Sequence, residues 1–397
     1  MRSFRIGSVF GIPLKLDLTF LLVLPLFAYI IASQVGATVD LLNTAWGASL
    51  PVGPLEEGAL PWLLGITSAL GLFAGVVLHE LGHSLVAMRY GFPIKSITLW
   101  LLGGMAQLSE MPEDWKQELA IAIAGPIVSV GVGLAAFAGF LLTPTGFPAA
   151  RFVLGYLALV NVALAVFNLL PAFPMDGGRV LRALLARKRP YARATQLAAE
   201  VGKGFAILMG LFGLFGGGGI FLIALAFFIY IAASGEAQQT TLKAAFEGVT
   251  VGDVMTPGED VDTVGRDLSV ADLIDRMFRE RHTGYPVIEN GSLVGMVTLE
   301  DARGVEEVER DAYRVEDVMT DDLHTIGADE DAMAAMNRMN EHRIGRLVVT
   351  DETGSLVGLL SRSDLMTALN IIRQSGSNTS LRRTEPSSES PTPEFQR

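Results

Sequence analysis

The sequence contains no cysteine, so disulfides and thiolate metal sites are excluded, and any transition metal must be bound by histidine and carboxylate side chains. Charge is also scarce: Asp, Glu, Lys and Arg make up 18% of the 397 residues, whereas 50% are hydrophobic. This balance predicts a polytopic membrane protein with room for a soluble domain.

Lysine is absent from residues 246–375, and this region is strongly acidic. It carries 27 Asp and Glu against 12 Arg, a formal charge of −15, whereas residues 1–245 carry +3. An acidic soluble half argues against a nucleic-acid partner. Ordinary acidic solubility explains the excess, and a halophilic, salt-rich cytoplasm is the alternative. Unfolding of this acidic half in dilute buffer and folding in molar salt would favour the halophilic alternative.

Long apolar runs predict six membrane spans of about 20 residues each. They lie approximately at residues 16–34, 60–86, 118–142, 152–171, 196–214 and 219–236. No cleavable signal peptide is evident. The connections 35–59 and 143–150 lack Lys and Arg, which gather in the connections on the other side. The positive-inside rule therefore predicts that both termini and the soluble half are cytoplasmic. The expected location is the cell membrane of a prokaryote, as a multi-pass protein.

The second span contains the motif His79-Glu80-Leu81-Gly82-His83. On an α-helix, His79 and His83 lie one turn apart and face the same way, so both imidazoles can bind one metal ion. Glu80 is placed to act as a base toward water rather than as a ligand. Because ionisable groups in hydrocarbon are costly without a partner or a task, the pattern predicts a zinc protease site in the membrane.

Asp176 is the predicted third ligand, in the stretch 168–179 that ends the fourth span. Two prolines three residues apart end that helix and leave Asp176 on the same side of the membrane, and at about the same depth, as His79 and His83. The remaining histidines all lie in the soluble half: His282, His324 and His342. Two imidazoles and one carboxylate leave a fourth zinc position open for water. An N-cap of the following helix is the alternative role for Asp176, and both roles can hold together.

The connection at residues 96–112 is apolar and rich in β-forming residues, but it is short and broken by Gly103-Gly104. We predict a re-entrant β-hairpin beside the metal motif, because such backbone is tolerated in a membrane only against protein or a water cavity. An amphipathic surface loop is the alternative. The expected fold class is thus a polytopic α-helical membrane domain with a re-entrant β-hairpin, followed by an α+β module.

The soluble half is an internal repeat, in which the pattern of residues 251–256 recurs 64 residues later at 315–320. Each copy predicts a strand, a helix, two strands and a second helix, with hairpin turns at Asn290-Gly291 and at residues 352–354. Two such units would bury their apolar faces against each other, with a cleft between them. The tail at 376–397 has no core-forming pattern and is predicted to be disordered.

The first half resembles the site-2 protease family of intramembrane zinc metalloproteases over about residues 1–235. The resemblance rests on the motif that contains His79, Glu80 and His83, followed by Asn168-x-x-Pro-x-x-Pro-x-Asp176-Gly. Gly103-Gly104 and Ala124-Gly125-Pro126 also fit. It implies that the two histidines and the aspartate bind one zinc ion and that Glu80 is the base. Asn168 matches an asparagine thought to steady the substrate or the tetrahedral intermediate, and a helix-end role is the alternative.

The repeat resembles a tandem pair of cystathionine-β-synthase-type (CBS) domains, which often bind adenine nucleotides. The resemblance implies that Thr298 and Asp301, and likewise Ser361 and Asp364, contact ATP, ADP or AMP, with each aspartate holding a ribose. Leu347 departs from the first copy, which has Pro286 at that place. A structural or dimerising module, with a homodimer formed through the CBS domains, is the alternative.

The expected domains are the protease at 1–240, CBS domains at 246–308 and 309–375, and the tail. The resulting hypothesis is a zinc metalloendopeptidase that cleaves a membrane-embedded helix of a single-span membrane protein in the lipid bilayer, as in regulated intramembrane proteolysis. Adenine nucleotides would regulate it. An ion or metal transporter with a CBS regulatory domain is the alternative, and its ionisable residues should line several spans. Proteolysis abolished by a chelator would separate the two.

Overall fold

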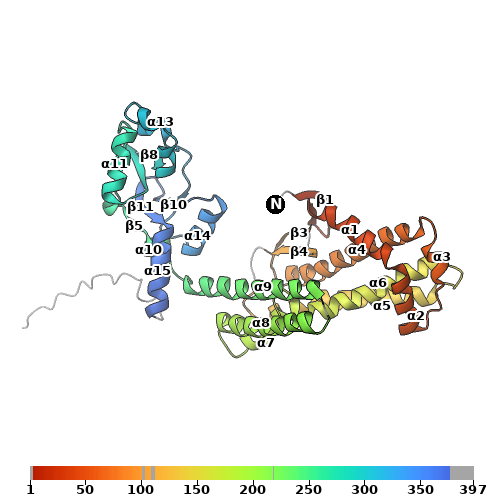
Figure 1. The fold of residues 1–397 in the computed structure, drawn as a ribbon. Helices are drawn as coiled ribbons and strands as arrows, with labels where there is room; N and C mark the ends of the chain where they lie inside the picture. Colours follow the sequence, from red (N-terminus) through yellow and green to blue (C-terminus); the bar gives the residue numbers. More distant parts are fainter. Residues whose placement is uncertain (1–2, 101–102, 109–111, 218, 376–397) are drawn as a thin grey trace, which may run out of the picture. The chain divides into compact units, whose positions relative to one another are not determined.

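A computed structural model describes residues 3–100, 103–108, 112–217 and 219–375 (Figure 1). The tail expected to be disordered, 376–397, lies outside the described residues. The chain forms two compact units, residues 1–240 and 241–397, which we describe in turn.

The first unit is mainly helical. Its helices are α1 (Phe20–Ser33), α2 (Val35–Trp46), α3 (Val52–Glu56), α4 (Leu60–Arg89), α5 (Trp115–Leu142), α6 (Pro148–Asn168), α7 (Asp176–Ala186), α8 (Tyr191–Phe215) and α9 (Gly219–Ala245). Among the described residues, α4, α5, α6, α8 and α9 are long and apolar enough to cross a membrane, and they coincide with five of the six predicted spans.

The first predicted span, 16–34, has the wrong boundaries. Leu16 and Asp17 belong to a strand, and the helix that follows bends by 64° between α1 and α2. The two helices pass the length and hydropathy test only as a pair, so a sixth span depends on counting them together. The strand forms because residues about 80 positions later supply its partner, which an apolar run cannot reveal.

A four-stranded sheet accompanies these helices, with the order β1-β2-β3-β4. Its strands are β1 (Ser3–Val9), β2 (Ile12–Asp17), β3 (Ile94–Trp100) and β4 (Gly103–Leu108). The β3–β4 pair is antiparallel, so a β-hairpin forms at the predicted place, and its entry into the membrane stays a prediction. The surface-loop alternative is wrong, because Ile97 is fully buried and packs with Ile12 and Leu81. Leu81 lies within the metal motif of α4, so the sheet packs directly beside that motif.

The local sequence explains how the helices around the site begin and end. The Asp114 carboxylate accepts hydrogen bonds from the backbone N–H groups of Lys116 and Gln117 and caps α5. Helix α6 ends at Asn168, ahead of Pro171, as predicted. Helix α7 begins at Asp176 after this proline-containing segment.

The second unit contains two small sheets, with orders β5-β11-β10-β9 and β6-β7-β8. Its strands are β5 (Thr256–Pro257), β6 (Val264–Gly265), β7 (Gly284–Glu289), β8 (Ser292–Thr298), β9 (Thr325–Ile326), β10 (Arg346–Thr350) and β11 (Leu356–Ser361). Its helices are α10 (Val251–Val254), α11 (Val270–Glu280), α12 (Leu299–Arg303), α13 (Val315–Val318), α14 (Ala332–Glu341) and α15 (Arg362–Ser375), with 3-10 turns η1 (Gly258–Asp260) and η2 (Glu307–Glu309). The turn between β7 and β8 has positive φ at Asn290 and Gly291, as the hairpin signal predicts.

The two copies exchange their opening segments. Val251, from the start of the first copy, is buried in the core of the second copy, and β5 pairs with β11. Val315, from the start of the second copy, is buried in the core of the first. Each core therefore needs both copies, which the repeat alone does not indicate.

Candidate functional site

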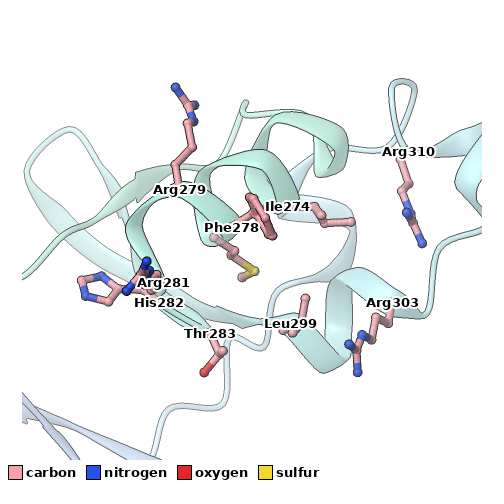
Figure 2. A pocket seen from close by; sticks show the side chains of 10 residues that line it. Ile274, Phe278, Arg279, Arg281, His282, Thr283, Leu299, Arg303 and Arg310 are labelled. Atoms are coloured by element: carbon pink, nitrogen blue, oxygen red, sulfur yellow. The ribbon is translucent and has the colours of Figure 1, made fainter.

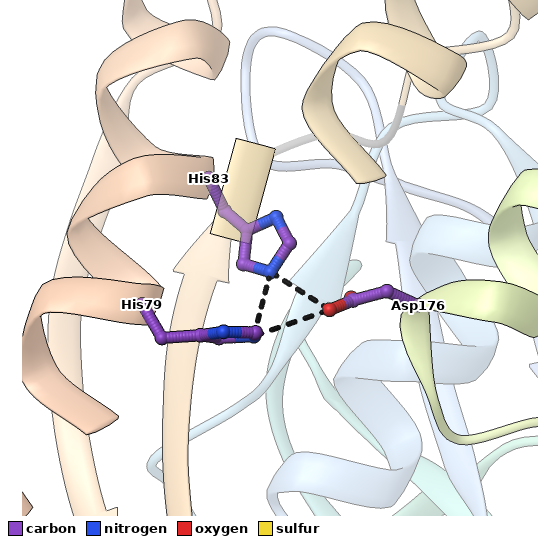
Figure 3. Close-up of side chains that lie close together, drawn as sticks. All are labelled: His79, His83 and Asp176. Carbon is purple, nitrogen blue, oxygen red and sulfur yellow. Dashed lines mark hydrogen bonds and ion pairs between the residues drawn. The ribbon is translucent and has the colours of Figure 1, made fainter. Parts of the chain in front are cut away.

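Three side chains from separate parts of the first unit converge at one buried point (Figure 3). The Nε2 atoms of His79 and His83 lie 3.2 Å apart, and Oδ2 of Asp176 lies 3.2 Å from the first and 3.0 Å from the second. All three residues are less than 9% exposed. The structure thus brings together the predicted ligands, which are supplied by α4 and by the start of α7.

The spacing of these donor atoms fits a zinc ion. Tetrahedral coordination with bonds of about 2.0–2.1 Å places its donors about 3.3 Å apart, close to the three distances between these atoms. Imidazole nitrogens and carboxylate oxygens are both common zinc ligands, and three of them leave one of the four tetrahedral positions open. The residues present therefore fit the metal.

Helix α5 orients both imidazoles through their other ring nitrogens. Nδ1 of His79 lies 2.8 Å from the hydroxyl of Ser129, and Nδ1 of His83 lies 2.7 Å from the carbonyl oxygen of Ile121. A carbonyl can only accept, so Nδ1 of His83 carries a proton, and Nε2 is the ring nitrogen that would bind a metal. Sequence reasoning missed both partners, because neither stands in a motif with the histidines.

Gly125 of α5 lies directly against the His83 ring. A Cβ atom at this position would overlap with Nε2 of His83, so any larger residue would displace the imidazole. The sequence did carry a signal here, because Ala124-Gly125-Pro126 is one of the stretches that supported the family resemblance. Its physical role, room for a ligand, becomes visible only in the folded chain.

Asp176 is the first residue of α7, and Met175 is the N-cap. The alternative role of Asp176 as an N-cap is therefore wrong. Burial by itself would raise the pKa of the Asp176 carboxyl, but hydrogen bonds with His79 and His83 outweigh this and lower that pKa below its usual value. The carboxylate is thus held ionised, as a metal ligand must be.

Glu80 points to the side of α4 that faces strand β4. A Cβ atom added to Gly104 would lie 2.6 Å from Cγ of Glu80, so the glycine backbone is what leaves room for this side chain. Glu80 is only partly buried, in contrast to the two histidines. The predicted base therefore lies between the ligand cluster and the edge strand of the sheet.

Asn168 ends α6, and its side-chain amide donates to the carbonyl oxygen of Leu164 at 2.9 Å. This is the helix-end arrangement that the sequence left open as an alternative. The half-buried side chain is not a member of the ligand cluster.

The four predicted nucleotide contacts form two equivalent helix starts in the second unit. The Thr298 hydroxyl donates to Oδ2 of Asp301 at 2.7 Å. Ser361 and Asp364 repeat this contact at the same distance in the other copy. Each aspartate also accepts from the backbone N–H of its Thr or Ser partner. These contacts cap the helices α12 and α15, a structural role the sequence did not consider.

A cavity of about 810 Å³ lies beside the first copy, between α11 and α12 (Figure 2). Its wall includes Ile274, Phe278 and Leu299, and the lining has no acidic residue although the unit is acidic. Its basic lining residues are Arg279, Arg281, His282, Arg303 and Arg310. Leu299 directly follows Thr298 in the chain, so the cavity adjoins one of the predicted nucleotide-contact pairs.

A second cluster of possible metal ligands lies on the surface of the second unit: Asp262, Glu280 and His282. All three residues are exposed. Glu280 already accepts a hydrogen bond from the Tyr285 hydroxyl at 2.8 Å and pairs with Arg276. The buried cluster is therefore the better zinc site of the two.

Comparison with known proteins gives consistent matches for both units. The model of peptidase family M50 matches residues 67–153 and 147–211, and the CBS domain model matches 251–306 and 315–371. A zinc metalloprotease of Methanocaldococcus jannaschii is 35% identical over 374 residues, which cover 93% of this chain and 97% of that protein.

This chain is also similar to two further proteins. A protein of Synechocystis named as a zinc metalloprotease is 30% identical over 383 residues, or 92% of this chain and 95% of its own length. The solved site-2 protease from Methanocaldococcus jannaschii is 36% identical and aligns with a TM-score of 0.40, covering 59% of this chain and 95% of that one.

Proposed function

This chain belongs to peptidase family M50, the site-2 proteases, as a multi-pass membrane zinc metalloprotease with a CBS-domain pair, and on that premise we propose that it cleaves a membrane-embedded helix of a single-span membrane protein. The observation that carries the proposal is the convergence of His79, His83 and Asp176 within 3.2 Å of one another. When bound there, zinc supplies the Lewis acidity that polarises a peptide carbonyl and makes water a nucleophile near neutral pH.

Glu80 accepts the proton of the attacking water and later donates it to the leaving amine. Its partial burial suits this role, because a base must exchange protons with a site that water can enter. Asn168, at the end of α6, is assigned by the family resemblance to steady the substrate or the tetrahedral intermediate. The helix-end bond to Leu164 is the competing role.

Strand β4 is the edge of its sheet, and its Gly104 contacts Glu80. An edge strand presents unpaired backbone groups and can take an extended peptide as an additional strand. A substrate helix must unwind before its scissile carbonyl is exposed. Pairing of the unwound segment with β4 would hold that carbonyl beside Glu80.

The test uses the purified chain in detergent with a membrane-protein substrate. We expect Glu80→Gln to retain zinc and lose cleavage, and Asp176→Ala to lose both. Addition of a chelator should abolish wild-type cleavage, and added zinc should restore it. Full cleavage by Glu80→Gln would defeat the assignment. The transporter alternative is not favoured, because the full-length relatives are named zinc metalloproteases.

For the CBS pair, we propose regulation by ATP, ADP or AMP, with Thr298, Asp301, Ser361 and Asp364 as contacts. The equivalent geometry of the two pairs and the neighbouring arginine-lined cavity support this. Isothermal titration should show nucleotide binding that Asp301→Ala weakens. Asp253→Ala is the matched control, because Asp253 makes the same capping contact with Thr250 at the start of the unit. Equal loss of binding in both variants would indicate a structural effect alone.

We also propose that both termini and the CBS pair are cytoplasmic and that the domains extend over 1–240, 246–308 and 309–375. Because the sequence has no cysteine, a single introduced cysteine is the only thiol, and its labelling reports on which side of the membrane that position lies. Thr145→Cys should react with an impermeant thiol reagent on intact cells. Ser355→Cys should react only after the cells are opened. The reverse result would contradict the orientation.

A further inference from the structure

Arg182 of α7 is a fully buried charge that the catalytic chemistry does not use. It lies in the connection after the fourth predicted span, on the side where Lys and Arg gather, yet it is only 1% exposed. Its guanidinium donates to Oε1 of Glu118 at 2.6 Å and to Oε1 of Glu236 at 2.5 Å. A buried arginine between two carboxylates is costly to build and fixes geometry more than it stabilises the fold.

The cluster joins the helix that supplies Asp176 to the helix that orients the histidines. Arg182 lies six residues after Asp176 on the short helix α7. Glu118, which is 4% exposed, lies on α5 three residues before Ile121, whose carbonyl contacts His83. The ion pair between Arg182 and Glu118 therefore connects the helix of the predicted third ligand to the helix that contacts the first two.

The same guanidinium also contacts the segment that enters α7. It stacks on the ring of Phe173, with its central carbon 5.1 Å from the ring centroid, and on Tyr191 at 4.9 Å. Phe173 is 2% exposed and precedes Asp176 by three residues. Arg182 thus restrains Asp176 from both directions along the chain.

From this geometry we propose that Arg182 is a positioning residue for the metal site, which holds Asp176 in place by joining α7 to α5 through Glu118 and to α9 through Glu236. The inference deepens the proposed function and rests on zinc binding by His79, His83 and Asp176. Because Arg182 also pairs with Glu236, the position of Asp176 depends on α9, and this helix continues past Thr241, where the second unit begins.

The test measures metal binding rather than cleavage. The metal is removed from the purified full chain in detergent, and zinc affinity is measured by competition with a chromogenic chelator. Cobalt is then added in place of zinc, because its absorption spectrum reports the ligand geometry. We expect Arg182→Met to weaken zinc binding about tenfold, the lower end of the range for residues that support ligands, and to alter the cobalt spectrum.

Arg151→Met is the matched control. Arg151 is also a buried arginine, 9% exposed and stacked on Phe140 at 4.6 Å, but it lies at the far end of α6. Arg151→Met should leave both the zinc affinity and the cobalt spectrum unchanged. Equal loss of zinc in both variants would show a general effect of removing a buried charge and would overturn the proposal.

Two milder variants keep the proposal testable if Arg182→Met does not fold. Arg182→Lys keeps the charge but cannot contact both glutamates through separate guanidinium nitrogens. Glu236→Gln removes only the ion pair with α9. Each should weaken zinc binding less than Arg182→Met and shift the cobalt spectrum. Wild-type binding and spectrum in both would overturn the positioning role. If the wild type itself binds no zinc, the proposed function fails, and that result is distinct from unaltered binding in the variants.

Discussion

Ser129 is separated from His79 by 50 residues in the chain, yet its hydroxyl lies 2.8 Å from the outer ring nitrogen of that histidine. Such partners fix the tautomer and the direction of a metal ligand. The His79 ring, with its Nε2 aimed at the cluster, depends on this contact as much as on its own helix.

We expect Ser129→Ala to weaken zinc binding about 10–100-fold, as is usual for loss of an outer-shell partner. The fold should tolerate the change, because alanine removes a single oxygen atom and is the residue that most favours a helix. Zinc competition in detergent measures the effect. Ser68→Ala is the control, since Ser68 is equally buried and its hydroxyl has no hydrogen-bond partner among the described residues. Zinc binding unaffected by Ser129→Ala would contradict the role.

Gly125 leaves room for the His83 imidazole, and a larger residue there should disturb the metal site. Gly125→Ala places a methyl group where Nε2 of His83 lies, so either the imidazole or α5 must move. We expect loss of zinc with retention of the helical circular dichroism signal. Gly131→Ala, in the same helix but with nothing near its added Cβ, should behave as the wild type.

At the scale of elements, the short strand β4 takes part in the site because its backbone passes against Glu80. The amino-acid composition of residues 96–112 predicts a hairpin, but it does not predict that the hairpin belongs to a four-stranded sheet. The N-terminal strands β1 and β2 lie at and before the start of the first predicted span, and the pairing of β2 with β3 is a tertiary event. Sequence patterns report which residues can form strands; they do not report which distant strand completes a sheet.

We expect Gly104→Val to impair cleavage while zinc stays bound. A side chain at this position collides with Glu80 and covers the edge of β4, so both the base and the docking of substrate are affected. Measured rates should show a lower kcat together with a higher KM. Gly7→Val, in strand β1 of the same sheet and with no neighbour near its added Cβ, is the control and should leave the kinetics unchanged. Unchanged kinetics in Gly104→Val would contradict the docking model.

At the scale of the whole molecule, the two CBS copies are one folding unit, because each lends its opening segment to the core of the other. Val251 and Val315 are both fully buried, each within the core built mainly by the other copy. The repeat period predicted two similar units, and the exchanged arrangement is an outcome of their packing.

Val251→Ala should therefore destabilise the second copy first. Truncating a buried valine costs roughly 1–3 kcal/mol. Hydrogen exchange of the full chain should rise in β10 and β11, and for Val315→Ala it should rise in β7 and β8. Faster exchange confined to the copy that carries each substitution would show that the cores are not shared.

The sequence by itself determined the membrane character, the candidate metal ligands and the repeat, because each depends on local periodicity or on rare residue types. With two histidines in the first half of the chain, few ligand sets could form. Only the tertiary structure decided which hydroxyl and carbonyl orient the imidazoles, which glycine leaves room for His83, and that Arg182 is buried between two glutamates. Those contacts join residues 38 to 64 positions apart, and such a distance in the chain leaves no periodic pattern from which a contact can be inferred.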